Sequence, residues 1–370
     1  MNNTNNRIES LQALRAIAFI GIFLSHAGAP FKWPALGVSI FYVLSGFLMN
    51  YKHSEILDYS PKGMFKFSID RIKKLYPLHI ITMICALVLA IVTLTQRGLT
   101  IKAIIFLIGK TVLNIFLLQT WVPNSGVNTS LNGVAWYLSV TMFLYFMFPQ
   151  IQRFIKKKKQ STLWIICIII LFLELLSCIP MIMLFGADSP VYIWFMYCFP
   201  VFRLGDFFVG CTLARWYSVL RMKQNSFAVQ SLIEIIATIL VVLVLVWRKS
   251  EHSNIFLLSL NNWTTLFIPF AAIFVLLFTI KGGLVTRFLS NKALIFIGNI
   301  SSYTFLIHYV VTQYTKSALS FLKLELPTHI LMIIILFEFI VTIALSLFYK
   351  RYESRLLSVL TTIKIKKKNE

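Results

Sequence analysis

Two residues near the start of the chain combine a side chain that binds anions with one that moves protons. Arg15 and His26 lie in the same apolar segment, residues 10–29, eleven positions apart. On an α-helix this spacing puts both side chains on one face, with a rise of about 16 Å between them. A guanidinium suits phosphate oxygens, and a neutral imidazole can act as a general base. The alternative is structural, with Arg15 reaching toward the end of the segment and His26 bonded to a neighbouring helix.

A second basic group lies farther along the chain, at residues 71–77. It contains Arg71, Lys73 and Lys74 and ends at Pro77. Cationic side chains grouped in this way can hold a phosphate group. The positive charge that cytoplasmic loops of membrane proteins carry would explain the same residues without any ligand.

The composition indicates what kind of elements must position these residues. The chain has 370 residues, of which 58% are hydrophobic and 13% are charged, and its net charge is +22. Soluble proteins have about 25% charged residues, so a water-soluble enzyme and a disordered chain are excluded. Apolar runs of about 20 residues predict an all-α integral membrane protein. Because the Lys and Arg residues cluster between these runs, we attribute the charge to cytoplasmic loops and expect no nucleic-acid partner.

The apolar segments predict a bundle of about ten transmembrane helices. Eleven segments can be distinguished, at residues 10–29, 35–51, 76–95, 101–121, 134–152, 161–185, 192–214, 230–247, 263–280, 293–315 and 328–349. Basic blocks, which we assign to the cytoplasm together with both termini, lie at residues 52–74, 153–159, 215–223, 281–292 and 350–368. Three segments separate the first two blocks, so an even number of them must cross. We therefore expect segment 101–121, which contains Lys102 and Lys110, to be re-entrant or interfacial.

One transmembrane domain is predicted for the whole chain, residues 1–370, with a basic cytoplasmic tail at 350–370. The polar stretches are too short to fold alone, so we expect no appended soluble domain. The cysteines all lie in apolar segments without a C-x-x-C pair, as expected of packing residues: Cys85, Cys167, Cys178, Cys198 and Cys211. No ligand spacing suggests a metal site.

Ionisable residues inside the apolar segments are further candidates, because a charge at bilayer depth costs roughly 2.5–3.5 kcal/mol. His308 lies past the middle of segment 293–315, at a depth similar to that of His26. The two imidazoles could share a cavity, or each could be a hydrogen-bonded core residue. Arg203 and Asp206 are three positions apart and can neutralise each other as a structural pair. We interpret three isolated carboxylates as structural: Glu174, Glu234 and Glu338.

Six motifs follow one another from about residue 7 to residue 350. They are Arg15-x10-His26, Gly37–Leu48, Arg71-x-x-Lys74-x-x-Pro77, Trp136–Pro149, Phe202-Arg203-x-x-x-Phe207-x-x-Gly210 and Ile297–His308. In this order they resemble motifs of the membrane-bound acyltransferase-3 family, whose members O-acylate cell-surface sugars and other acceptors. Thr141 stands where the family usually has a Glu. Lys74 stands for the second arginine of an Arg-x-x-Arg motif, which keeps the charge but loses bidentate geometry.

The resemblance implies an acyltransferase whose co-substrate is acetyl-CoA or another short acyl-CoA, such as succinyl-CoA, without a metal. It marks His26, Arg15 and His308 as catalytic candidates, and Arg15, Arg71, Lys73 and Lys74 as donor-binding candidates. Other candidates in the motifs are Ser45, Trp136, Ser139, Tyr303, Arg203 and Asp206. His26 would be a general base or carry the acyl group itself, and Arg203 could stabilise an oxyanion.

The family also implies an acceptor and a location. The acceptor would be a hydroxyl of an extracellular or cell-envelope polysaccharide, or of its lipid-linked precursor. The location would be the plasma membrane of a bacterium, with polysaccharide-synthesis proteins as possible partners. An envelope glycan or a small molecule remains open as the acceptor.

Two other functions stay open. A transporter or flippase for a lipid-linked sugar would have broken helices near the membrane midplane, and Pro200, Gly205 and Pro269 could break helices here. The second of these functions is that of a non-catalytic component of polysaccharide export. Thr141 in place of the family Glu keeps the transporter open, because a member without catalysis could still move the substrate.

Overall fold

The computed structural model describes residues 8–30, 33–53, 57–220, 226–247, 264–280, 282–323 and 327–369, without the side chains of residues 97, 218–220 and 354–369. Within these ranges the chain is mostly helical and contains no strand, which confirms the predicted all-α membrane fold. Some residues of the predicted cytoplasmic blocks lie outside the described backbone or side chains: Arg221, Lys223, Lys281, Lys364 and Lys366–Lys368.

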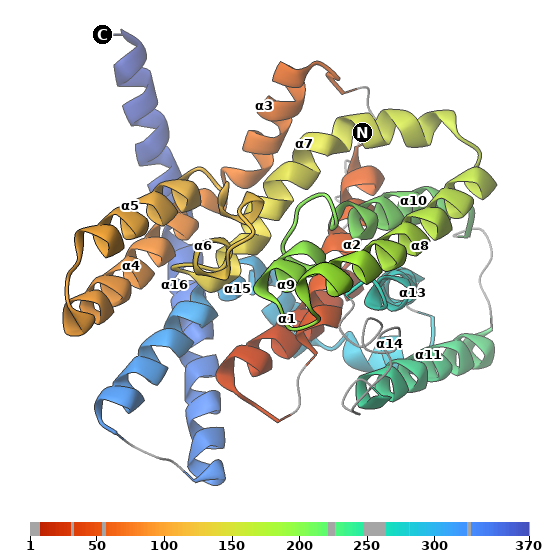
Figure 1. Cartoon of the computed structure of the whole chain (residues 1–370). Coiled ribbons are helices and arrows are strands. Elements are labelled where there is room, and N and C mark those ends of the chain that lie inside the picture. Colours follow the sequence, from red (N-terminus) through yellow and green to blue (C-terminus); the bar gives the residue numbers. More distant parts are fainter. Residues whose placement is uncertain are drawn as a thin grey trace.

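Figure 1 shows the helices arranged in one bundle. Their bounds are α1 (Ser10–Ala27), α2 (Pro34–Lys52), α3 (Pro61–Ile72), α4 (Tyr76–Arg97), α5 (Ile101–Ile115), η1 (Gln119–Trp121), α6 (Ser125–Asn128), η2 (Gly133–Ala135), α7 (Trp136–Lys157), α8 (Gln160–Phe185), α9 (Pro190–Tyr197), α10 (Leu204–Leu220), α11 (Phe227–Trp247), α13 (Phe267–Ile280), α14 (Leu284–Leu289), α15 (Lys292–Phe321) and α16 (Thr328–Asn369).

Eight of the described helices are long and apolar enough to cross a membrane: α1, α2, α4, α7, α8, α11, α15 and α16. Two predicted crossings are missing from this set. The segment at 192–214 is broken into α9 and α10 around Pro200, and α13 has 14 residues. α5 has 15 residues, which gives about 22 Å against a hydrocarbon core of about 30 Å. Its length agrees with the prediction that segment 101–121 does not cross.

Close contacts at glycines hold the central helices together. α2 packs against α10 and α13, and α1 packs against α15 and α2. A Cβ atom added at Gly46 of α2 would lie 2.1 Å from the carbonyl oxygen of Phe207, and one added at Gly210 of α10 would lie 2.0 Å from that of Val43. Small residues that let backbones approach closely are the usual contact between transmembrane helices.

The contact between α1 and α15 is closer still and brings two predicted site helices together. A Cβ atom on Gly298 would lie 1.7 Å from the carbonyl oxygen of Gln12. From this point both helices run in the same direction, because Arg15 contacts Ser302 and His26 contacts His308. The side chains singled out on α1 therefore face those singled out on α15.

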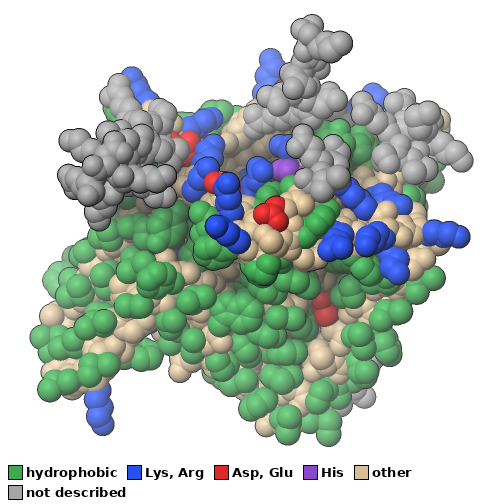
Figure 2. All heavy atoms as spheres, turned by 90° about the horizontal axis from the view of Figure 1, so that it is seen from above, with side chains coloured by type: hydrophobic (Ala, Val, Ile, Leu, Met, Phe, Trp, Pro, Cys, Tyr) green, Lys and Arg blue, Asp and Glu red, His purple; other side chains and the backbone are tan. Residues whose placement is uncertain are grey.

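Charge is distributed unevenly over the surface. Figure 2 shows Lys and Arg side chains gathered on the upper part of one face, above flanks covered by hydrophobic side chains. The outer helices carry many exposed apolar residues, such as Ile168 on α8, Leu243 on α11 and Ile333 on α16. An apolar belt of this kind is expected where helices contact lipid.

Gly298→Ala tests the contact between α1 and α15. The added methyl group has no room, so we expect the variant to unfold about 1–3 kcal/mol more easily, with a lower thermal midpoint in detergent. The matched control is Gly109→Ala, since an added Cβ atom there meets nothing within 4 Å. Equal midpoints for the two variants would contradict the close approach.

Candidate functional site

A cavity of about 280 Å³ lies between α1, α2, α3, α7 and α15. One end, called here the basic end, is formed by Lys52, His53 and Arg71, and Lys52 and Arg71 are exposed. The other end, called the aromatic end, is formed by Phe41, Tyr137 and Phe305. Phe41 and Lys52 both belong to α2, so the cavity extends about 17 Å along this helix.

The cavity wall is positively charged. Its fixed cations are Arg15, Lys52 and Arg71, and the residues that line it in the described part of the chain include no Asp or Glu. Thr141, the residue that stands in the position of the family Glu, is one of the lining residues, and its hydroxyl donates to the carbonyl oxygen of Tyr137 at 2.7 Å. A wall with cations and no carboxylate favours an anionic ligand such as a phosphate.

His53 holds the guanidinium of Arg71 at the basic end. The Nδ1 atom of His53 lies 2.9 Å from the carbonyl oxygen of Met49, which can only accept, so Nδ1 is the donor. The Nε2 atom of the neutral ring then accepts from Nη2 of Arg71 at 2.8 Å. The guanidinium also lies 5.0 Å from the centre of the Phe67 ring. The sequence did not identify His53 as a site residue, because nothing in the local sequence predicts a contact between residues 18 positions apart.

The other two residues of the predicted phosphate clamp do not line the cavity. Lys73 forms an exposed ion pair with Asp70, at 2.8 Å, which holds the pKa of the Asp70 carboxyl below its ordinary value. Lys74 forms an ion pair with Glu353, at 3.6 Å. Of the three basic residues, only Arg71 reaches the cavity, and Lys52 adds a cation that the sequence motif does not include.

Tyr303 forms a hydrogen bond with Glu353, the residue that also pairs with Lys74. Its hydroxyl lies 3.0 and 2.9 Å from the two carboxylate oxygens of Glu353, and Nζ of Lys74 lies 5.8 Å from the centre of its ring. These contacts tie α15 to α16 and to the chain before α4. Tyr303 does not line the cavity, so the structure gives this predicted substrate residue an anchoring contact.

Arg15 and Ser45 lie in the cavity wall between its two ends. Nη2 of Arg15 donates to the hydroxyl of Ser302 on α15 at 2.5 Å. The hydroxyl of Ser45 lies 2.9 Å from that of Tyr145, which joins α2 to α7 across the wall. A ligand in the cavity would pass both groups on the way from the basic end to the aromatic end.

The two predicted histidines contact each other directly. Nδ1 of His26 lies 2.9 Å from Nε2 of His308, and the two rings are stacked with their centroids 5.2 Å apart. His308 is fully buried, and the rings of Phe19 and Phe305 lie 5.6 and 5.8 Å from its own. Neither histidine lines the cavity. The pair lies beyond the aromatic end, where Phe305 contacts His308.

The hydrogen bonds of His308 determine which nitrogen of His26 is basic. Nδ1 of His308 lies 3.1 Å from the carbonyl oxygen of Thr304, so Nδ1 donates. In the neutral ring Nε2 must then accept, and the donor is the Nδ1–H of His26. This assignment leaves the lone pair of His26 on Nε2, where a neutral imidazole can take a proton.

Lys316 fixes the position of His26 from the far end of α15. Its Nζ atom donates to the backbone carbonyl oxygen of His26 at 2.7 Å. This carbonyl belongs to the last turn of α1, where a cation is favourable because the helix dipole is negative. The ring of Tyr309 lies 5.0 Å from the ring of His26, edge to face. The imidazole is therefore held through its backbone, its partner ring and an aromatic neighbour.

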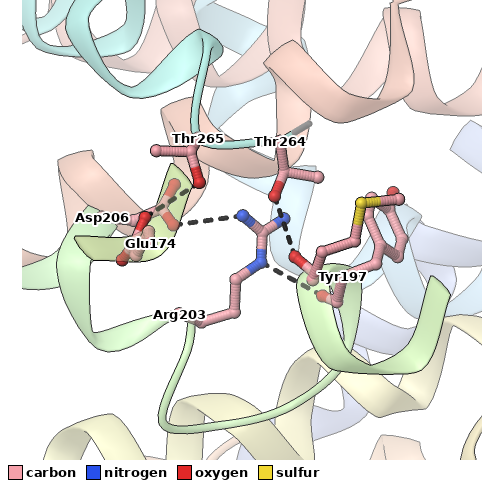
Figure 3. Close-up of polar contacts among 7 residues, drawn as sticks. Glu174, Tyr197, Arg203, Asp206, Thr264 and Thr265 are labelled. Carbon is pink, nitrogen blue, oxygen red and sulfur yellow. Dashed lines mark hydrogen bonds and ion pairs between the residues drawn. The ribbon is translucent and has the colours of Figure 1, made fainter. Parts of the chain in front are cut away.

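Arg203 and Asp206 form a buried pair outside the cavity. Nη1 of Arg203 lies 3.1 Å from Oδ2 of Asp206, and both side chains are inaccessible to solvent. Figure 3 shows the guanidinium between Asp206 on one side and the carbonyl oxygen of Tyr197, 3.1 Å from Nε, on the other. The carboxylate of Glu174, on α8, lies beside Asp206 and accepts from Thr265 at 2.9 Å.

This buried cluster connects four parts of the bundle. Glu174 comes from α8, Tyr197 from α9, Asp206 from α10 and Thr265 from the turn before α13. The interpretation of Glu174 as a structural residue fits this place. Arg203 is not among the lining residues, so no contact with the cavity supports the oxyanion role that the family resemblance implies for it.

Trp136 and Ser139 are also buried away from the cavity. The ring of Trp136 lies 4.8 Å from that of Tyr197. The hydroxyl of Ser139 donates to the carbonyl oxygen of Leu117 at 2.5 Å and lies 2.6 Å from that of Thr120. Both residues join the start of α7 to neighbouring segments and do not contact the space where a ligand would lie.

Comparisons with known proteins show the family to which the chain belongs. A family model described as an acyltransferase domain matches residues 8–349, which include the cavity and the histidine pair. The chain belongs to the acyltransferase-3 family. Among its relatives, the acyltransferase MdmB of Streptomyces mycarofaciens is 26% identical over 229 residues, 56% of this chain and 57% of the relative.

A second relative matches more of the chain. The O-acetyltransferase OatA of Staphylococcus aureus (strain NCTC 8325 / PS 47) is 26% identical over 349 residues, 89% of this chain and 54% of the relative. The chain thus spans a little more than half the length of either relative. No solved structure matches the chain. In the described part of the chain, no group of three or more His, Cys, Asp or Glu side chains could hold a metal ion.

Asp206→Asn tests whether the buried pair stabilises the bundle. The change leaves the guanidinium of Arg203 without its counter-charge, so we expect a loss of about 3–5 kcal/mol in the free energy of unfolding. Asp70→Asn is the matched control, since Asp70 and Lys73 form an exposed pair with the same spacing. There we expect a change below about 1 kcal/mol. Similar thermal midpoints for both variants would contradict the structural role of the cluster.

Proposed function

We propose that this protein is a membrane O-acyltransferase that moves an acetyl or other short acyl group from a cytoplasmic acyl-CoA to a hydroxyl group. The acceptor that fits the family is an extracellular or cell-envelope polysaccharide, or its lipid-linked precursor. One observation carries the proposal: the hydrogen bond between His26 and His308, placed beyond the aromatic end of a cationic cavity. This order of groups suits a donor with phosphates at one end and a reactive thioester at the other.

The basic end of the cavity is the proposed site for the phosphates of the donor. Lys52 and Arg71 are exposed there, and His53 orients Arg71. The pantetheine arm would then extend past Arg15 toward the aromatic end, along the 17 Å or so that α2 provides. Lys73 and Lys74 have no part in this proposal, because neither lines the cavity.

His26 is proposed to act as the general base. Its Nε2 atom takes the proton of the acceptor hydroxyl as the oxygen attacks the thioester carbonyl. The C–S bond then breaks, and the thiolate of coenzyme A leaves and receives the proton. The Nδ1–H of the protonated ring still donates to His308, which stabilises the charged form. An acyl group carried on His26 itself is the alternative route.

The location follows from the same proposal. Acyl-CoA is cytoplasmic, so the face that carries the basic end would be the cytoplasmic face, as the positive-inside rule also suggests. Both termini would then lie on the cytoplasmic side of the plasma membrane of a bacterium. Proteins of polysaccharide synthesis are the expected partners, and the acceptor would approach the histidine pair from the membrane or the outer side.

One observation favours the second candidate function, transport of a lipid-linked sugar. The segment at 192–214 is interrupted between α9 and α10, and a buried charged cluster lies at the interruption. Transporters place broken helices and charges at their substrate site. The cluster, however, does not line the cationic cavity, and Arg203 is neutralised by Asp206, so the acyltransferase is the better supported function.

The decisive test measures transfer from radiolabelled acetyl-CoA in membranes that contain the native envelope acceptor. We expect His26→Ala to lower the rate of transfer by about 10²–10⁴-fold, the usual contribution of a general base. His79→Ala is the matched control, because His79 is another buried imidazole that lies outside the cavity and bonds to the carbonyl oxygen of Asn114. Its expected effect on the rate is small.

Either of two results would count against the acyltransferase. Wild-type membranes that transfer no label under these conditions would favour transport. A His26→Ala variant that retains the wild-type rate, at matched expression, would remove the general base from the mechanism.

A second prediction concerns donor binding. His53→Ala removes the acceptor for Arg71, and a hydrogen bond to a charged group contributes about 1.5–3 kcal/mol. We therefore expect the KM for acetyl-CoA to rise about 10–100-fold with little change in kcat. His53→Gln should restore binding, since its amide can also accept from Arg71 while it donates to Met49. The control is Lys73→Ala, which lies outside the cavity, and an equal rise in KM there would contradict the proposed donor site.

A further inference from the structure

The aromatic end of the cavity is closed by three rings from three helices. Phe41 comes from α2, Tyr137 from α7 and Phe305 from α15. The centroids of Phe41 and Tyr137 are 6.0 Å apart, those of Phe41 and Phe305 are 5.8 Å apart, and those of Tyr137 and Phe305 are 5.1 Å apart. Every pair is thus in contact, and the rings form a triangle across this end.

Phe305 lies between the cavity and His308. Its side chain lines the cavity, and the centroid of its ring lies 5.8 Å from that of His308. His26 and His308 do not line the cavity. A thioester that enters from the basic end therefore meets Phe305 before it can reach His308, the histidine of the pair that Phe305 contacts.

Of the three rings, Phe305 is the one for which the described chain shows a ring contact with His308. Tyr137 is stacked on Tyr42 at 4.6 Å, and Tyr42 lies 5.4 Å below the guanidinium of Arg203. The Tyr137 ring is thereby tied to the buried charged cluster. A change of side-chain rotamer at Phe305 would open the path with less disturbance than movement of Tyr137.

A separation of this kind has a chemical reason. A base that activates a hydroxyl can activate water as well, and water is far more abundant. In that side reaction the oxygen of water bonds to the acyl carbon, the C–S bond breaks, and the thiolate takes the proton, which gives free coenzyme A and a carboxylic acid. Enzymes with activated donors avoid this loss by excluding water from the reacting groups.

We propose that Phe305 determines whether the acyl group goes to the acceptor or to water. With its ring across the aromatic end, the donor thioester stays out of reach of His26. When the acceptor occupies the site, the ring turns aside and the thioester reaches the base. This inference rests on the proposed acyltransferase function and adds to it a residue that sets specificity for the acceptor over water.

The test uses the full-length protein, purified and reconstituted in lipid nanodiscs without any acceptor. Release of labelled acetate from labelled acetyl-CoA is then a measure of hydrolysis alone. We expect slow release by the wild type and release at least tenfold faster by Phe305→Ala. Phe305→Leu keeps an apolar side chain of intermediate size and should give an intermediate rate, which also covers the case in which the alanine variant does not fold.

Two further variants identify the cause of faster release. Phe339→Ala removes another aromatic ring from the same region, which packs on Phe19 and Phe23 at 6.3 and 5.2 Å but does not line the cavity. It should hydrolyse at the wild-type rate. The double variant with Phe305→Ala and His26→Ala should return to background, because the hydrolysis is expected to need the same base as the transfer.

Different results would overturn the role of Phe305 and the acyltransferase function on which it rests. If the wild type transfers acetyl groups in native membranes but the folded Phe305 variants release acetate no faster than the wild type, only the role of Phe305 is overturned. A faster release by Phe339→Ala of the same size would also overturn it. If the wild type transfers nothing in native membranes, the acyltransferase proposal fails and this inference fails with it.

Discussion

The contact between α1 and α15 is the constraint on which the site depends. In a bilayer no hydrophobic force draws two helices together, so close backbone packing and polar contacts must do it. Here Gly298 lets α15 approach the backbone of α1 at Gln12. The same approach sets the distance from Arg15 to Ser302 and from His26 to His308. A wider separation would break both contacts at once, and with them the alignment of the proposed anion-binding and proton-accepting groups.

Charged side chains occur in two different settings in this protein. In the cavity wall Arg15, Lys52 and Arg71 face a space that a ligand can enter. At the junction of α8, α9 and α10, Arg203 and Asp206 neutralise each other, and Arg203 also donates to the carbonyl oxygen of Tyr197. Desolvation makes such a pair costly to break. It suits a fixed joint between helices, whereas cations in the wall of a cavity suit a ligand that arrives and leaves.

The sequence predicted the helical membrane fold and the face shared by Arg15 and His26, because both depend on local periodicity. The relation of His26 to His308 could be expected from similar depth, but only the structure shows that the two rings bond directly. Two features had no local signal, because each depends on residues that tertiary packing brings together: His53 accepts a hydrogen bond from Arg71, and Glu353 forms an ion pair with Lys74. The break between α9 and α10 had a signal in Pro200, but the length of the apolar run predicted one crossing there.

The cationic wall has a consequence for how the protein would respond to the supply of its donor. The phosphates that Lys52 and Arg71 would hold are the same in acyl-CoA and in the free coenzyme A that remains after transfer. Only the acyl end distinguishes them, and a small acyl group adds little, since each buried methylene contributes about 0.8 kcal/mol. Product and substrate would therefore compete for the cavity on nearly equal terms. The rate of surface modification would follow the ratio of acylated to free coenzyme A in the cytoplasm, and so the metabolic state of the cell.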